Sequence, residues 1–359
     1  MKQDGNIQIE ASVDVFPFRI IATVTSAPEE RFSDADAATA QKLTRIWLRV
    51  LARPAIGHDE DFFEAGGDPG AAIRLFAEIR IEFGRTIPPL AIYTARTIRS
   101  LTHLLTHEIP VRFSNLLLLK TGPKRPAAFF FPGLGGNVME FFALSECIDW
   151  PHPIYGLQPK GSDGLEPPLD RIETMAAYHL DAIRDVQPSG PYVLCGYSLG
   201  GLVALEVARQ ISDCGEKIAL LCMIDSYLHE TLLPAKRRFR SRWERMCYRA
   251  SRALQVSKPG TNGGTKSETL SEKMCGSAIR NVEKNALLAW AAYRPIPYSE
   301  NVAFFRAAVS TGFGDPAGWQ DVVSAMEVRI VPGDHYSVLE SGAPDLAAAI
   351  SWSAERALP

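Results

Sequence analysis

A serine in a tight glycine turn is the residue whose setting points most directly to chemistry. Residues 192–195 form a short apolar run, Gly-Tyr-Ser-Leu-Gly follows at 196–200, and apolar residues then recur at helical spacing to Gln210. A strand, a G-x-S-x-G turn and a helix in this order predict a nucleophile elbow, from which Ser198 projects. The helix start directs free N–H groups at a developing oxyanion, and the N–H of Leu199 is the first candidate donor.

A serine hydroxyl needs a base, and one of the seven histidines has a suitable setting. His335 stands in Val-Pro-Gly-Asp-His-Tyr, a turn directly after a predicted strand at 327–331. Open α/β sheets place their sites at the carboxyl ends of strands, so His335 is the expected base. The other histidines lie in helical or linker segments and are not expected to act: His58, His103, His107, His152, His179 and His229.

Three aspartates compete for the position behind this histidine. Asp225 directly follows an apolar strand and is preferred, while Asp315, in a later loop, is the rival. Asp334 adjoins His335, but neighbours in sequence usually point apart. The chosen carboxylate would hold the imidazole tautomer, and the chain order Ser198, Asp225, His335 is the order of a triad that follows a nucleophile elbow.

A second oxyanion donor is expected in the glycine-rich stretch Phe-Pro-Gly-Leu-Gly-Gly at 131–136. This stretch ends an early predicted strand, and glycines let backbone amides approach a substrate closely. The N–H of Leu134 is the candidate. The alternative is that the stretch is only a structural turn.

The predicted elements bring these residues to one edge of a sheet. Alternating strands and helices argue for a mostly parallel sheet that is covered on both faces. Apolar runs predict strands at 116–119, 127–131, 153–157, 191–195, 218–224, 302–307 and 327–331. Helical spacing predicts helices at 138–148, 172–186, 199–213 and 343–356.

A long segment, about 228–292, interrupts this alternation. It carries 13 Lys and Arg residues against 5 Asp and Glu, in a chain of net charge −3, and a flexible break at 257–267. Its place between core strands predicts a helical lid. Its basic residues, such as Arg237, Arg238 and Arg240, either complement an acidic partner surface or substrate, or form a solvated helix face.

The N-terminal third predicts a separate small unit. Residues 1–33 form an extension of unknown role, 34–108 a helical bundle, and 109–126 a linker with the first strand of the following unit. Helices are expected at 36–52, from Pro69 to about 83 with Asp68 as N-cap, and at 90–105.

Composition narrows the possible partners and compartments. The 359 residues suggest two domains, and 46% hydrophobic with 22% charged residues is ordinary for a globular protein. The net charge of −3 favours neither nucleic acid nor a membrane surface. The six cysteines show no metal-binding spacing, so no metal is expected. No resident cofactor is expected either. No secretion signal or membrane span is recognised, and a cytoplasmic location is expected.

Several stretches of the larger unit match a known family. They are Phe-Pro-Gly-Leu-Gly-Gly (131–136), Gly-Tyr-Ser-Leu-Gly-Gly (196–201), Met-Ile-Asp-Ser-Tyr (223–227), Tyr-Arg-Pro-Ile-Pro-Tyr (293–298) and Val-Pro-Gly-Asp-His-Tyr-Ser (331–337). On these, residues 115–359 resemble the thioesterase domain that ends non-ribosomal peptide synthetases. The resemblance implies an α/β-hydrolase fold with a helical lid insertion. It also implies a serine acylated from a phosphopantetheine thiol, with Asp225 as the acid.

The helical unit carries Asp-Phe-Phe-Glu-Ala-Gly-Gly-Asp at 61–68. On this stretch, residues 34–108 resemble the peptidyl carrier domain that precedes such a thioesterase, a small all-α bundle. The family's next residue is the serine that receives the phosphopantetheine arm, but here it is Pro69. The resemblance therefore implies a degenerate carrier unit with no attachment site.

The two resemblances imply a thioesterase that acts in trans on an acyl or peptidyl chain. The chain is expected to arrive as a thioester on the phosphopantetheine of another carrier protein, because no adenylation or condensation module is attached. Two alternatives stay open. One is an acyltransferase or cyclase in which an amine or alcohol attacks the same acyl-enzyme, and the other is a non-catalytic scaffold that docks carrier proteins.

Overall fold

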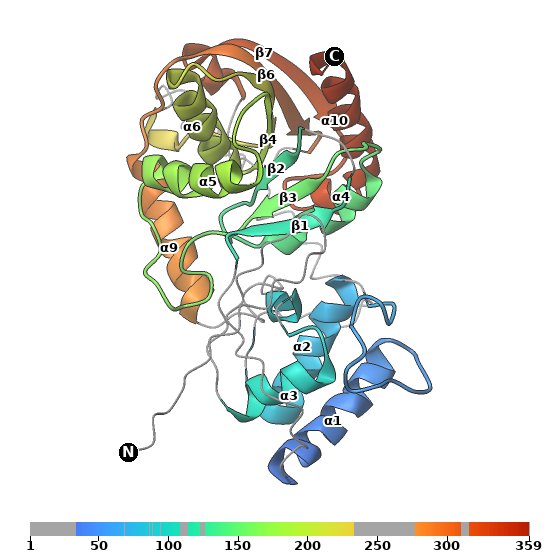
Figure 1. The fold of residues 1–359 in the computed structure, drawn as a ribbon. Helices are drawn as coiled ribbons and strands as arrows, with labels where there is room; N and C mark the ends of the chain where they lie inside the picture. The colour runs from blue at the N-terminus through green and yellow to red at the C-terminus, as the bar shows by residue number, and fades with distance from the viewer. Residues whose placement is uncertain are drawn as a thin grey trace, which may run out of the picture. The chain divides into compact units, whose positions relative to one another are not determined.

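The computed structural model describes most of two compact units, 1–114 and 115–359 (Figure 1). The described residues are 34–67, 69–85, 87, 89–93, 95–107, 114–122, 126–232, 277–309 and 316–358. The predicted extension 1–33 lies outside them. So do Asp68, Asp315 and most of the predicted lid, including its three named arginines.

The first unit is a helical bundle, as predicted. Its elements are α1 (Asp34–Val50), α2 (Pro69–Phe83), a 3₁₀ turn (Pro89–Tyr93) and α3 (Ile98–Thr106). Apolar positions at helical spacing supply its core, where Leu43 and Trp47 of α1 are buried with Leu75 and Ile79 of α2.

One prediction for this unit is wrong in detail. The segment 90–105 is not one helix, because Thr97 caps a new helix with its side chain accepting from the Ser100 N–H. The Ser100 hydroxyl in turn accepts from the Thr97 N–H at 3.0 Å and completes a capping box. Ser100 therefore lies in the first turn of α3 rather than late in a longer helix.

The second unit is built on the predicted parallel sheet. Its described strands are β1 (Leu116–Lys120), β2 (Ala128–Phe131), β3 (Ile154–Leu157), β4 (Tyr192–Tyr197), β5 (Ile218–Ile224), β6 (Tyr298–Ala307) and β7 (Val323–Val331). Their order is β1-β3-β2-β4-β5-β6-β7, with β1 antiparallel to β3 and each other neighbouring pair parallel. The loops after β2, β4, β5 and β7 thus meet at one edge.

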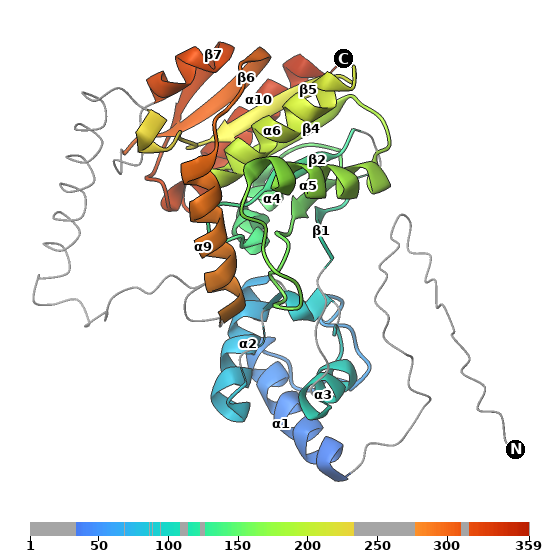
Figure 2. The same ribbon diagram turned by 90° about the vertical axis from the view of Figure 1, so that its left-hand side faces the viewer.

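Helices cover both faces of the sheet. Helices α5 (Ile172–Val186) and α6 (Leu199–Asp213) lie on one face, and α4 (Phe142–Cys147) and α10 (Ala343–Ala357) lie on the other (Figures 1 and 2). The described residues of the predicted lid are 228–232, with a 3₁₀ turn at Glu230–Leu232, and helix α9 (Ser277–Ala292), which packs beside α5. These layers give the α/β-hydrolase architecture that the sequence predicted.

The core of this unit follows from continuous apolar strands. β2, β3 and β4 are buried along their whole lengths, as expected for strands with helices on both faces. Cys195 and Cys222, opposite each other on β4 and β5, are fully buried in this core. The predicted helix 138–148 is divided into a 3₁₀ turn (Val138–Phe141) and α4. Among the described helices, none combines the length and apolar character that crossing a bilayer requires.

Candidate active site

Ser198 occupies a strained turn between β4 and α6. Its backbone has φ 52° and ψ −120°, in a region that residues with a side chain rarely adopt. A Cβ on Gly196 would collide with the Gly200 carbonyl oxygen, so the turn closes only because residue 196 lacks a side chain. The Ser198 N–H donates to the Ile224 carbonyl at 2.8 Å, which ties the turn to the end of β5.

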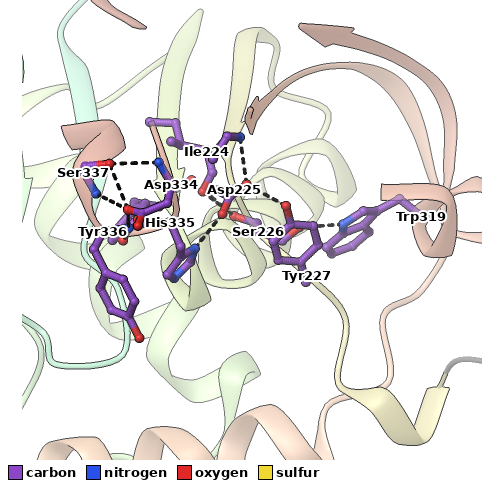
Figure 3. Close-up of polar contacts among 12 residues, drawn as sticks. Ile224, Asp225, Ser226, Tyr227, Trp319, Asp334, His335, Tyr336 and Ser337 are labelled. Atoms are coloured by element: carbon purple, nitrogen blue, oxygen red, sulfur yellow. Dashed lines mark hydrogen bonds and ion pairs between the residues drawn. The ribbon is translucent and has the colours of Figure 1, made fainter. Parts of the chain in front are cut away.

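His335 and Asp225 form a buried pair at the same edge of the sheet. The imidazole Nδ1 lies 2.6 Å from Asp225 Oδ2, and the two side chains are 9% and 3% exposed (Figure 3). A carboxylate only accepts, so Nδ1 carries the proton and donates. Nε2 of the neutral ring is then the atom available to take a proton from a serine hydroxyl.

Two further donors fix the Asp225 carboxylate. Its Oδ1 accepts from the Tyr227 hydroxyl at 2.6 Å and from the Ala307 N–H at 2.9 Å. Asp225 has a φ of 44°, and its own N–H donates to the Phe305 carbonyl at 2.7 Å. Neighbouring strands β5 and β6 therefore hold the residue in the orientation that meets His335.

The turn that carries His335 is held by Asp334 and Tyr197. Asp334 Oδ1 accepts from the N–H groups of Tyr336 and Ser337, at 3.0 and 2.9 Å, and from the Ser337 hydroxyl at 2.8 Å (Figure 3). The Tyr197 hydroxyl donates to the His335 carbonyl, and the two rings stack with centroids 5.1 Å apart. Tyr197 immediately precedes Ser198, so this stacking places the imidazole beside the serine turn.

The prediction of Asp225 over Asp334 agrees with this geometry, because Asp334 caps its own turn. The rival Asp315 lies outside the described residues. The remaining histidines that the sequence set aside do not join the pair.

The glycine-rich loop lies against the start of α6. A Cβ on Gly200 would collide with the Phe131 carbonyl oxygen, and a Cβ on Gly133 would lie 3.5 Å from the Ser198 Cβ. The Gly133 N–H is already used, because it donates to Glu140 Oε1 at 2.8 Å. That leaves the next amide, of Leu134, as the candidate donor beside the N–H of Leu199.

Leu134 and Leu199 line a common cavity. The other lining residues are mostly apolar and come from the loop, the segment between β3 and α5, and helices α5, α6 and α9. The cavity can therefore hold an apolar group next to both candidate oxyanion donors.

Four contributors to this site were not predicted from the sequence: Tyr197, Tyr227, Glu140 and His179. A signal existed for His179, because it falls on the apolar stripe of 172–186. Glu140 likewise follows the glycine-rich loop within an otherwise apolar stretch. The contact of Tyr197 with His335 spans 138 residues of sequence and gave no such signal. Among the described residues, no group of three or more His, Cys, Asp or Glu is placed to hold a metal ion.

Comparison with known proteins assigns both units. The family model described as "Thioesterase domain" matches residues 127–353, and "Phosphopantetheine attachment site" matches residues 41–105. The chain belongs to the thioesterase domain family. A carrier-type unit precedes its thioesterase unit, in the order that the sequence predicted.

Synthetases are among the similar proteins. Indigoidine synthase of Streptomyces lavendulae is 34% identical over 52% of this chain and 15% of its own length. A dimodular nonribosomal peptide synthase of Bacillus subtilis is 30% identical over 76% of this chain and 12% of its own. The chain thus spans a small part of these curated relatives.

Solved structures show the same fold. A four-domain nonribosomal peptide synthetase covers 96% of this chain and 27% of its own, with a TM-score of 0.55 and 20% identity. The type II thioesterase BorB of the borrelidin cluster covers 67% of this chain and 97% of its own, with a TM-score of 0.50 and 15% identity. At these identities, the likeness is one of fold.

Proposed function

We propose that this protein is a serine thioesterase that releases an acyl or peptidyl chain through an acyl-enzyme. The observation that carries the proposal is the buried His335–Asp225 pair beside the strained Ser198 turn, in a chain of the thioesterase family. A structural serine has no need of a φ of 52° or of an oriented imidazole nearby.

The reaction follows from the geometry in two halves. Ser198 Oγ attacks the thioester carbonyl while His335 Nε2 takes the hydroxyl proton. The N–H groups of Leu134 and Leu199 stabilise the oxyanion. The C–S bond then breaks, the thiol leaves with the proton from His335, and the acyl group stays on the serine. Water then attacks the ester carbonyl and gives a proton to His335, the ester C–O bond breaks, and His335 returns the proton to Ser198 Oγ as the free acid leaves.

The substrate is proposed to arrive on the phosphopantetheine arm of a separate carrier protein. Support comes from the similar synthetases and from Pro69, which has no hydroxyl at the position where the carrier family attaches its arm. The protein's own carrier-like unit would then serve in docking or packing, and the enzyme would act in trans.

Replacement of Ser198 tests the proposal. Ser198→Ala removes only the nucleophile, so thioester turnover should fall on the order of a million-fold while the thermal unfolding midpoint is kept. A fluorophosphonate should label the wild type at Ser198 alone, as read by peptide mass spectrometry. Turnover of the variant above about a hundredth of the wild-type rate would contradict the assignment, since triad losses are far larger.

Product analysis in the same assay distinguishes the fates of the acyl-enzyme. Mass spectrometry of products from acyl-carrier substrates should show the free acid. An ester, amide or ring formed with an added alcohol or amine would instead identify transfer or cyclisation.

A further inference from the structure

His179 is a buried histidine that the proposed reaction does not use. It lies on α5, on the buried stripe that also contains Ala176, Leu180 and Ile183. Its side chain lines the same cavity as Leu134 and Leu199, the two candidate oxyanion donors. A polar ring on an apolar stripe therefore reaches the space in which an acyl group would lie.

The imidazole of His179 is enclosed and incompletely bonded. The residue is 4% exposed, and its Nδ1 is a buried atom with no hydrogen-bond partner. Its surroundings are aromatic, with the Phe131 ring 5.7 Å away, edge to face. Burial lowers the pKa of His179 to about 3, so the ring is neutral at working pH.

A neutral imidazole has one donor and one acceptor nitrogen. Because Nδ1 is enclosed, Nε2 is the atom that can meet a ligand in the cavity. Two other lining side chains carry polar groups, Lys160 and Tyr178, and both are half-buried. The Lys160 ammonium lies 3.7 Å from Glu166 and 5.9 Å from the Tyr178 ring, so it already has acidic and aromatic neighbours. His179 is the fully buried polar group among these three.

We propose that His179 is a specificity-determining residue whose Nε2 hydrogen-bonds a neutral polar group, an amide or a hydroxyl, on an otherwise apolar acyl chain. A chain without that group leaves a buried polar atom unpaired when it fills the cavity. Sites of this kind reject such analogues more strongly than apolar pockets reject a missing methylene. The inference rests on the proposed function and adds the substrate feature that the cavity selects.

Two matched thioesters test whether His179 selects acyl chains that carry a neutral polar group. Heptanoyl and N-butanoylglycyl pantetheine thioesters have acyl chains of equal length, and the second carries one amide. The wild type should favour the amide substrate in kcat/KM. His179→Phe keeps an aromatic ring without the nitrogens and should reduce this preference about five- to tenfold, chiefly through KM. His179→Gln should restore part of it.

Met175→Leu is the matched control, because Met175 lines the same cavity and the exchange preserves volume without changing polarity. It should leave the preference unchanged. The inference would be overturned if a folded His179→Phe variant kept the same preference for the amide substrate as the wild type. A loss of this preference in Met175→Leu as large as that in His179→Phe would also overturn it.

A binding measurement keeps the test separate from turnover. Thioether analogues of the two substrates cannot be cleaved, and calorimetry gives their affinity for Ser198→Ala with and without His179→Phe. If no thioester is hydrolysed but amide-dependent binding requires His179, the proposed reaction fails and the binding inference stands. If the wild type hydrolyses heptanoyl thioester and neither measurement depends on His179, the inference fails and the thioesterase stands.

Discussion

At the scale of single residues, the carboxylates of Asp225 and Asp334 have different roles in the site. Asp225 accepts from His335 Nδ1, Tyr227 and Ala307, so it orients the imidazole. Asp334, next to His335 in sequence, accepts from the N–H groups of Tyr336 and Ser337 and shapes the turn. The functional difference between them comes from contacts and not from residue type.

Asp225→Asn should lower kcat roughly ten-thousand-fold if the pair behaves like other triads. An amide can present an N–H toward His335 and favour the tautomer with its proton on Nε2. Asp334→Asn is the control, because an asparagine retains the oxygen that accepts from Tyr336 and Ser337, and kcat should stay within a few-fold of wild type. Steady-state hydrolysis of a pantetheine thioester measures kcat for both variants. A larger loss of kcat in Asp334→Asn than in Asp225→Asn would mean that Asp225 is not the carboxylate that orients the imidazole.

Glu140 gives a pH-dependent prediction at this scale. Burial raises the pKa of Glu140 from 4.5 to about 7, although the Gly133 N–H partly favours the ionised form. The folded protein thus holds a proton that the unfolded chain releases, and this side chain lowers stability as pH rises from about 4.5 to 7. The full effect is on the order of 3 kcal/mol.

Glu140→Gln removes this ionisation and keeps an acceptor for Gly133. Its free energy of unfolding relative to wild type should rise as pH increases from 4.5 to 7 and then level off. Urea unfolding at pH 5 and pH 8 measures the difference. A difference that is the same at both pH values would show that Glu140 is not protonated in the folded state.

At the scale of elements, α9 forms one wall of the cavity and is anchored at its end. Val282, Ala286 and Ala289 are buried at helical spacing, and the first two line the cavity. The same face continues to Tyr293, whose hydroxyl donates to Glu206 of α6 at 3.0 Å. The Trp290 indole N–H donates to the Tyr227 carbonyl at 3.1 Å, close to Asp225 in sequence. The wall is thus fixed to α6, the helix that follows Ser198.

Tyr293→Phe removes one buried hydrogen bond, while Glu206 keeps Arg209 and Gln210 as donors. Stability should fall by about 1 kcal/mol, and KM for a thioester should rise because the cavity wall is less constrained. Tyr192→Phe is the matched control, since its hydroxyl donates to Glu216 at 3.0 Å at the start of β4, the strand end opposite the site. Urea unfolding should show a similar loss for both variants, with KM changed only in Tyr293→Phe.

At the scale of the whole molecule, two units with separate cores divide the chain at residue 114. We expect the carrier-like unit to be folded and never loaded. Pro69 begins α2, where its missing N–H has no intrahelical partner and its fixed φ suits a first turn. The residue that removes the attachment hydroxyl therefore also favours the helix.

Incubation of the full chain with coenzyme A and a promiscuous phosphopantetheinyl transferase should leave its intact mass unchanged. The serine variant Pro69→Ser is the comparison. A gain of one phosphopantetheine arm by this variant would show that the surrounding surface is still recognised. The same gain on the wild type would contradict the prediction and identify another attachment residue.

The sequence by itself determined the fold and the main candidates because those depend on local pattern. Alternating apolar strands and helices predicted the parallel sheet, and such a sheet brings the residues after β4, β5 and β7 to one edge. The elbow glycines, His335 and Asp225 could all be recognised from their positions at strand ends. Boundaries that depend on capping, such as the new helix start at Thr97, were not predicted.

Only the tertiary structure decided which distant groups touch. The contacts of Tyr197 with His335, of Glu140 with Gly133 and of Tyr293 with Glu206 join different elements and left no spacing signal in the chain. His179 was readable as a polar residue on an apolar stripe, but its cavity and its unpartnered Nδ1 were not. Periodicity tells which face of an element is buried, whereas the identity of the atoms it meets is set by how the elements pack.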